Sequence, residues 1–181
     1  MKKYAILTAV GADRVGIVDE LTSVILSRRC NIEESRMAVL GGEFAIVLLF
    51  SGEADGVRAL LEELPVRGAD LALNISAKET VAPKADPQSR PYLLESVSLD
   101  TPGIVHSVTS LLRRHGVNIE DLETETTPAP WTGAPLFRMR ARLSVPAAAS
   151  IARLREDLED LEAQTNLDLK LSPIAPGQAE F

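Results

Sequence analysis

The sequence contains one stretch that occurs twice. Residues Asp13–Arg36 and Asp100–Glu123 align without a gap when the chain is shifted by 87 positions, the interval from Asp13 to Asp100. The two copies share nine identical positions: Asp13/Asp100, Gly16/Gly103, Ile17/Ile104, Val18/Val105, Thr22/Thr109, Ser23/Ser110, Asn31/Asn118, Ile32/Ile119 and Glu33/Glu120. A self-match of this kind indicates two copies of one structural unit, so the chain is predicted to fold as a tandem repeat.

The interval between the copies sets the size of each domain. A chain of 181 residues leaves room for two small domains. We expect domain one at 1–80, a proline-rich linker at 81–91, domain two at 92–172 and a loosely held tail at 173–181. Because domains of this size bury only about 60–65% of the surface of the unfolded chain, we expect each to pack against its twin or another chain, and the protein to form homo-oligomers.

The first copy is predicted to fold as a β-α-β-β-α-β unit. Apolar residues at three- and four-residue spacing indicate a helix over Gly16–Arg29, whose last turn holds two arginines. Gly41-Gly42 indicates a tight hairpin turn, and Pro65 is expected to end a second helix, Ala54–Leu64. The expected strands are Tyr4–Val10, Asn31–Val39, Phe44–Phe50 and Asp70–Ser76. Since the third of these strands is apolar at every position, both of its faces are expected to be covered, and the second helix can cover only one.

The second copy repeats this order of elements. Its first strand is expected at Tyr92–Leu99, and Pro102 is expected to open a helix that Asp100 or Thr101 caps and Gly116 ends. The remaining elements include a helix over 147–163 and a closing strand over 167–171. The predicted fold class is therefore α+β, with two ferredoxin-like units in tandem, each an antiparallel sheet with helices on one face.

The hairpins of the two copies differ. In the second copy a long loop over Pro128–Pro135 replaces the glycine turn, and the strand after it alternates apolar residues with arginines. A hairpin closed by this loop places acidic residues opposite those arginines: Asp121 with Arg142, Glu123 with Arg140, and Glu125 with Arg138. The sequence therefore predicts a charge ladder on one solvated sheet face, in which each pair contributes about 0.2–1 kcal/mol.

Charge and composition argue against several classes of function. A formal net charge of −7 disfavours direct binding to DNA or RNA, which requires clustered Lys and Arg. The one cysteine, Cys30, has no partner for an internal disulfide, which is consistent with a reducing cytoplasm. The apolar run after Met1-Lys2-Lys3 leads straight into the repeated motif and is interpreted as a strand rather than a signal peptide. No run approaches the length of a membrane span.

The turn that precedes the first helix of each copy is the candidate binding site. A helix N-terminus presents unpaired backbone N–H groups to a carboxylate, and a glycine lets a ligand approach the backbone closely. Asp13 and Asp100 could accept an ammonium group, and Asn31 and Asn118 offer amide donors and acceptors. Together these groups suit an amino acid zwitterion. The alternative is purely structural: the aspartates cap the helices and the asparagines end them.

The same residues resemble a known family. The sequences D-R-V-G-I-V at 13–18 and D-T-P-G-I-V at 100–105, with N-I-E at 31–33 and 118–120, resemble the ACT domain, a small-molecule sensing module of amino acid metabolism. The resemblance covers almost the whole chain twice. More narrowly, the glycine cleavage system repressor proteins, which carry two ACT domains, are similar over the stretches 11–18, 30–36, 40–44 and 64–70.

The resemblance implies a regulator without enzymatic activity or cofactor, which acts by contact with a transcriptional activator rather than with DNA. In ACT domains the ligand sits between paired units, held by the first turn and by the residues that open the second strand. Carried over to this sequence, the ligand-binding positions are Asp13, Arg14, Gly16, Asn31, Asp100, Thr101, Gly103 and Asn118. Glycine is the first candidate ligand, with serine next. Val15 stands where many ACT domains have proline, which the second copy supplies as Pro102.

The remaining reactive side chains do not suggest a catalytic or metal-binding group. His106 is expected to be solvated, His115 to lie at a helix C-terminus, and Cys30 to be buried as a small apolar residue. Trp131, on the long loop, either anchors a partner or covers its own hairpin. Two hypotheses follow: an amino acid sensor that changes its affinity for a protein partner, or a ligand-free interaction module built from the paired units. An enzyme is disfavoured.

Overall fold

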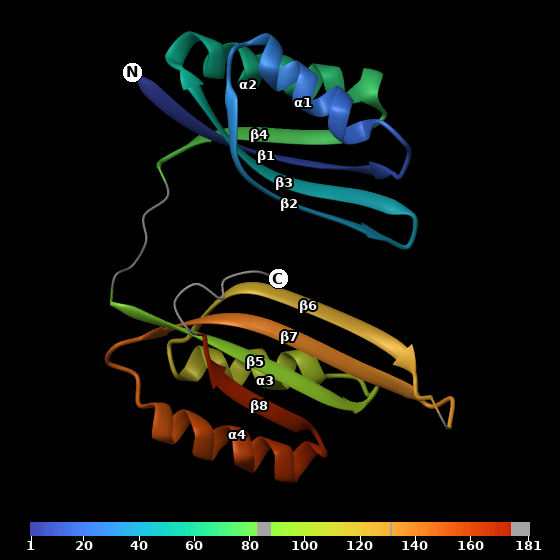
Figure 1. The fold of residues 1–181 in the computed structure, drawn as a ribbon, viewed down its shortest axis with the longest axis vertical. Helices are drawn as coiled ribbons and strands as arrows, with labels where there is room; N and C mark the ends of the chain where they lie inside the picture. Colours follow the sequence, from blue (N-terminus) through green and yellow to red (C-terminus); the bar gives the residue numbers. More distant parts are fainter. Residues whose placement is uncertain (83–87, 131, 175–181) are drawn as a thin grey trace. The chain divides into compact units, whose positions relative to one another are not determined.

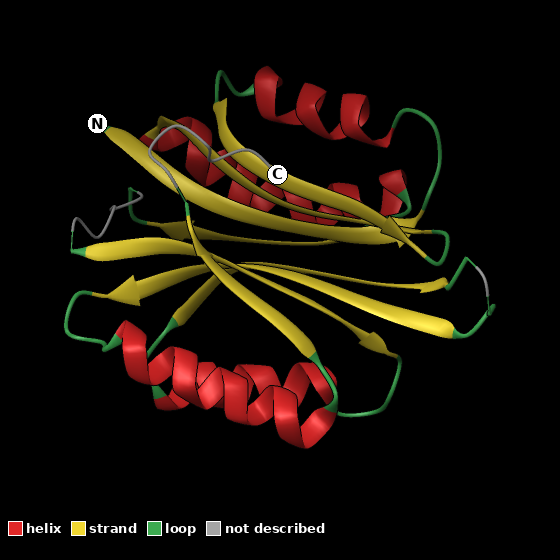
Figure 2. Ribbon diagram, turned by 60° about the horizontal axis from the view of Figure 1, so that its bottom comes forward, coloured by secondary structure: helices red, strands yellow, loops and turns green. Residues whose placement is uncertain are grey.

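Both copies fold into the element order that their periodicity predicts. The computed structural model describes residues 1–82, 88–130 and 132–174. The chain divides into two units, Met1–Lys84 (unit 1) and Ala85–Phe181 (unit 2), each with the order β-α-β-β-α-β (Figure 1). In each unit four antiparallel strands form one sheet, and both helices lie on the same face of that sheet (Figure 2). The predicted α+β fold of two ferredoxin-like units is confirmed.

Unit 1 is built on a sheet with the strand order β2-β3-β1-β4. Its elements are β1 (Lys2–Ala12), α1 (Ile17–Ser27), β2 (Asn31–Leu40), β3 (Glu43–Glu53), α2 (Ala54–Leu71) and β4 (Asn74–Thr80). The tight turn between β2 and β3 is confirmed, with φ of 61° at Gly41 and 85° at Gly42. A two-residue hairpin turn of this kind needs positive φ at both positions, which glycine adopts without steric cost.

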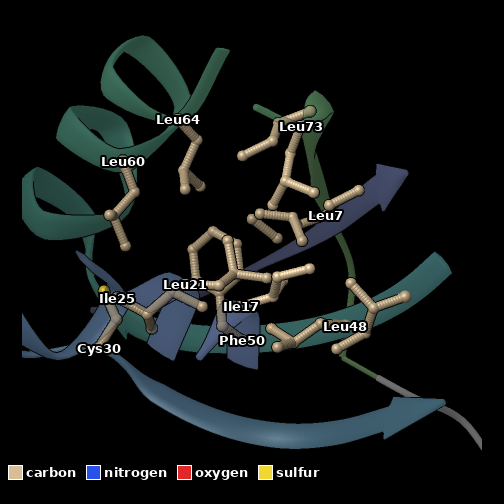
Figure 3. Packing of buried hydrophobic residues seen from close by; sticks show 14 of the residues in the cluster. Leu7, Ile17, Leu21, Ile25, Cys30, Leu48, Phe50, Leu60, Leu64 and Leu73 are labelled. Atoms are coloured by element: carbon tan, nitrogen blue, oxygen red, sulfur yellow. The ribbon is translucent and has the colours of Figure 1, made fainter. Parts of the chain in front are cut away.

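The core of unit 1 lies between the sheet and its helices (Figure 3). Alternate residues of β3, from Phe44 to Phe50, are buried, and α1 contributes Ile17, Leu21 and Ile25, which recur every four residues on one helix face. Cys30 belongs to the same cluster and is only 5% exposed, which confirms its predicted role as a small apolar residue.

Helix α2 differs most from the prediction. The helix does not stop at Pro65 but continues to Leu71, and β4 begins at Asn74 rather than at Asp70. Leu64 and Gly68 are buried on one side of the helix, so packing against the sheet carries it past the hydrogen bond that proline cannot donate. The close approach requires a glycine, because a Cβ at position 68 would lie 2.6 Å from the Leu73 carbonyl oxygen.

Helix α1 is shorter than predicted. It ends at Ser27, and the two arginines expected in its last turn lie beyond it, with Arg29 at a φ of 56°. Arg28 instead bridges to α2, where its Nη2 lies 2.8 Å from Glu63 Oε2. The chain leaves the helix at Arg28 and turns through Arg29 to enter β2 at Asn31.

Unit 2 has the strand order β6-β7-β5-β8. Its elements are β5 (Ser89–Leu99), α3 (Ile104–Arg114), β6 (Asn118–Pro128), β7 (Pro135–Pro146), α4 (Ile151–Thr165) and β8 (Asp168–Pro173). Helix α3 ends as predicted, with His115 as its C-cap and Gly116 at a φ of 66°. His115 also joins the two helices of the unit, since its Nε2 lies 2.7 Å from Asp157 Oδ2 on α4.

The predicted charge ladder is present on the helix-free face of unit 2. The register pairs Asp121 with Arg142, Glu123 with Arg140 and Glu125 with Arg138. The residues between the arginines on β7 are buried, so the arginines point away from the core. Arg138 and Glu125 lie 3.7 Å apart, and Arg140 lies 3.7 Å from Glu95 of β5, so the ladder extends to a third strand.

The helix-free face of unit 1 is apolar and remains partly exposed. Val47 on β3 is 46% exposed, and its neighbours Ala45 and Leu49 are half-buried. The expectation that this face is covered as well, by the other domain or by another chain, stays a prediction. No helix in the described ranges is long and apolar enough to cross a membrane.

Candidate functional site

The turn between the first strand and the first helix has the same backbone geometry in both units. Gly16 and Gly103 are the N-cap residues of α1 and α3, with φ of 96° and 98°. Each turn is also tied to the end of a neighbouring hairpin, since the Asp13 N–H donates to the Gly42 carbonyl oxygen at 2.9 Å and the Asp100 N–H to that of Pro135 at 3.0 Å. Glycine is required at the N-cap because other residues rarely adopt such a positive φ.

This geometry contradicts the helix-cap interpretation of the turn. The helix of unit 2 begins at Ile104, so Pro102 precedes the N-cap instead of opening the helix, and neither Asp100 nor Thr101 caps it. Within the described residues, neither N-terminus receives a hydrogen bond from a capping side chain. The first backbone bonds run from Glu20 to Gly16 and from Ser107 to Gly103, which leaves the N–H groups of the first turn available to an anion.

The turn of unit 1 is already occupied by an ion pair. Arg14 makes a two-pronged contact with Glu20, with Nη1 2.8 Å from Oε1 and Nη2 2.5 Å from Oε2. The hydrogen bond from Arg14 holds the pKa of the Glu20 carboxyl below its ordinary value. Arg14 also donates to the carbonyl oxygen of Leu71 at 3.2 Å, which ties the turn to the end of α2. A carboxylate therefore already stands near this helix N-terminus.

The turn of unit 2 is more open. A Cβ built on Gly103 would meet no atom of the described chain within 4 Å, whereas one on Gly16 would lie 3.5 Å from Glu20 Oε1. The first turn of α3 carries no acidic residue. The Asp100 carboxylate accepts a hydrogen bond from Thr126 Oγ1 at 3.4 Å. Of the two turns, that of unit 2 offers an incoming carboxylate the less crowded helix N-terminus.

The asparagines lie far from the turns of their own units. Asn31 pairs with Ser51, which in turn pairs with Tyr4 near the start of β1, while the turn follows the end of β1. Ala12 follows Tyr4 by eight positions along β1, which is about 26 Å at roughly 3.3 Å per residue. Asn118 is placed in the same way, beside Ser144. Asp13, Arg14 and Gly16 thus come together in unit 1, and Asp100, Thr101 and Gly103 in unit 2, but one unit does not bring its asparagine to its own turn.

A charged network beside Asn31 was not predicted from the sequence. The Ser51 hydroxyl donates to Glu33, and Lys2 Nζ lies 2.9 Å from the same carboxylate. The hydrogen bond from Ser51, followed by that from Lys2, lowers the pKa of Glu33. Lys2 also lies 5.2 Å from the centre of the Tyr4 ring. Only the recurrence of Asn-Ile-Glu in both copies pointed to this end of the sheet.

The other reactive residues form no chemical site in the described part of the chain. His106 is exposed, and its Nε2 lies 3.4 Å from Ser110 Oγ. Burial raises the pKa of the Cys30 thiol, which makes it a poor nucleophile. No group of three or more His, Cys, Asp or Glu positioned to hold a metal was found among residues 1–82, 88–130 and 132–174. Trp131 lies outside the described residues.

Comparison with known proteins gives consistent matches. Residues 3–78 and residues 92–163 each match a sequence model of the ACT domain. The glycine cleavage system transcriptional repressor of Escherichia coli (strain K12) is 34% identical over 163 residues, which cover 90% of this chain and 86% of that protein. A UPF0237 protein of Methanopyrus kandleri is 41% identical over 73 residues, which cover 39% of this chain and 81% of that protein.

One solved structure is similar in fold and in sequence over nearly the full length of this chain. The crystal structure of an unknown protein from Galdieria sulphuraria has a TM-score of 0.81 and 34% sequence identity. The match covers 97% of this chain and all of that one (100%). The similarity therefore extends over both units and the order in which they occur.

Proposed function

Because this chain belongs to the ACT domain family, as a tandem protein of the glycine cleavage system transcriptional repressor family, we propose that it is a regulatory protein that senses a small amino acid. Glycine is the first candidate ligand and serine the second. The proposal assigns the protein no catalytic activity and places its action in the cytoplasm.

One observation carries this proposal. In both units a helix N-terminus follows an aspartate, is opened by a glycine at positive φ and receives no side-chain cap within the described chain. A carboxylate of the ligand would bind the free N–H groups, and the aspartate would accept its ammonium group. Because the first turn of α3 lacks the acidic residues present in α1, we assign the tighter site to unit 2.

The proposed ligand is shared between two chains. A turn and the asparagine of the same unit lie at opposite ends of one sheet, so a small amino acid cannot reach both within that unit. In a homo-oligomer, the turn of one chain would meet the asparagine of the same unit in a second chain. The asparagine amide would then complete the hydrogen bonds of the ligand.

The regulatory output is a change of affinity for a protein partner, which we propose to be a transcriptional activator. The net charge of −7 makes a direct role at DNA unfavourable. For the ligand to regulate this contact, it must bind the partner-competent and partner-incompetent states with different affinities. Binding of the activator of the glycine cleavage genes should therefore change when glycine is added.

The melting temperature of the protein, measured with single amino acids at millimolar concentration, tests ligand binding. A ligand at about 100 times its dissociation constant stabilises the folded state by about 2.7 kcal/mol, which is a shift of several degrees. We expect glycine or serine to give this shift, and the double variant Asn31→Ala/Asn118→Ala to lose it. A shift that is unchanged in the double variant would contradict the assigned site, and no shift with any amino acid would favour a ligand-free interaction module.

A further inference from the structure

The helix-free face of unit 1 contains a hollow that the turn sites do not use. Its volume is about 490 Å³, within the range of small-molecule sites. Its floor consists of Ile6 on β1 with Val47 and Leu49 on β3, all aliphatic. One wall is the chain segment Thr80–Ala82, which begins with the last residue of β4 and leads toward unit 2. The floor therefore suits an apolar group of a few carbon atoms.

On the β2 side of the hollow, an acidic and a basic side chain lie next to each other and form its rim. Glu34 and Arg36 both lie on β2, where they pair with Leu49 and Val47 of the floor. Residues two apart on a strand point to the same face and are about 6.6 Å apart along it. Arg36 Nη2 and Glu34 Oε1 lie 3.4 Å from each other, and both side chains are more than half exposed. An exposed pair of this kind contributes little to stability and is easily exchanged for other partners.

Unit 2 carries no such site at the equivalent position. Arg142 and Arg140 occupy the places of Leu49 and Val47 in its sheet, and Asp121 and Glu123 occupy those of Glu34 and Arg36. The charged row continues across the sheet, where Arg140 faces Glu95. An apolar floor beside a rim that carries one acidic and one basic side chain is thus specific to unit 1, although both units share one fold.

We propose that this hollow binds a free α-amino acid with an aliphatic side chain. The ammonium group pairs with Glu34, the carboxylate pairs with Arg36, and the side chain covers Val47 and Leu49. A zwitterion carries its two charges one carbon apart, so it fits between two rim groups of opposite sign that are separated by a few ångströms. This site goes beyond the proposed turn sites, and an occupied hollow would hold the segment that leads out of unit 1.

Isothermal titration of the full-length protein with L-leucine tests this site. The variant Val47→Arg/Leu49→Arg copies the residues that unit 2 carries in the same fold, and it should lose leucine binding by at least about 10-fold, equivalent to about 1.4 kcal/mol. Val97→Arg, which adds an arginine to the helix-free face of unit 2, is the matched control and should bind as the wild type does. Circular dichroism melts verify that the variants are folded.

Ligand analogues and a second variant separate the contributions of the rim. Isopentylamine lacks the carboxylate and 4-methylpentanoate lacks the ammonium group, so both should bind at least about 10-fold more weakly than leucine, as should leucine to Glu34→Gln/Arg36→Gln. Leucine binding should survive Asn31→Ala/Asn118→Ala, the variant that tests the turn sites. The inference is overturned if leucine does not bind, if the two arginines leave its binding unchanged, or if the asparagine variant abolishes it.

Discussion

At the scale of single residues, Glu33 couples the stability of unit 1 to pH. Its pKa is lowered by the hydrogen bond from Ser51 and by Lys2, so the stability that it contributes is present above the ordinary glutamate pKa of about 4.3 and is lost as pH falls through the lowered value. Glu33→Gln should destabilise the protein at pH 7, and the difference from wild type should shrink below about pH 4. Urea unfolding from pH 2.5 to 7 measures both effects.

The control for this prediction is Glu43→Gln, which removes a carboxylate at the start of β3, away from the Lys2 and Ser51 network. If Glu43→Gln reduces the loss of unfolding free energy at low pH as much as Glu33→Gln does, that loss arises from the net charge of the protein and not from the Lys2 and Ser51 network.

Gly52 and Cys30 form a tight contact between β3 and the entry to β2. A Cβ at position 52 would overlap the Cys30 sulfur, so Gly52→Ala should cost about 1–3 kcal/mol of unfolding free energy through overpacking. In a Cys30→Ala background the same substitution should cost less, because the sulfur is gone. Equilibrium denaturation of the four proteins of this cycle measures the coupling, and equal costs in both backgrounds would contradict the contact.

At the scale of elements, α2 shows packing prevailing over local preference. Proline at position 65 cannot donate the hydrogen bond to residue 61, yet the helix continues to Leu71. Pro65→Ala should restore that bond and raise the unfolding free energy by up to about 3 kcal/mol. Val66→Ala, at an exposed position of the same helix, should change it by less than about 0.5 kcal/mol. A loss of stability in Pro65→Ala would mean that the fold depends on the proline.

The hairpin of unit 2 shows the opposite case, in which the local sequence pattern was sufficient to predict how its two strands pair. The alternation of arginines with apolar residues on β7 and the acidic residues of β6 gave the register of the ladder, residue for residue. A shift by one position would turn the arginines into the core, so burial excludes odd shifts, and the pairing of acidic residues with arginines distinguishes this register from a shift by two. The extension of the ladder to Glu95 was not predicted, because it depends on which strand lies on the far side of β7.

At the scale of the whole molecule, the separation of the turns from the asparagines leads to a complementation test. One chain carries Gly16→Val/Gly103→Val, which blocks both turns, and the other carries Asn31→Ala/Asn118→Ala. Neither variant alone should show a glycine-induced thermal shift. Chains that are unfolded together and refolded as a mixture should regain part of it, because some oligomers combine an intact turn with an intact asparagine. Melting curves of the mixture with and without glycine measure this shift. A mixture without a glycine-induced shift would contradict a ligand shared between chains.

The sequence by itself determined the features that depend on neighbours along the chain. The repeat gave two units, hydrophobic periodicity gave their order of strands and helices, and the glycine pair gave the tight hairpin turn. These features follow from local preferences and from the need to bury one face of each element. The candidate residues of each turn, Asp13 to Gly16 and Asp100 to Gly103, were proposed from the helix N-terminus that they precede and from the resemblance to ACT domains, and they stay a prediction.

Only the tertiary structure decided what depends on contacts between distant segments. The continuation of α2 past Pro65 rests on packing against the sheet, and the glycine N-caps rest on a backbone bend that residue types alone do not specify. The distance between Asn31 and its turn follows from strand pairing, and the hollow of unit 1 arises only where Val47, Leu49 and Ile6 from two strands meet the rim of a third. Such arrangements are non-local, so no window of sequence contains them.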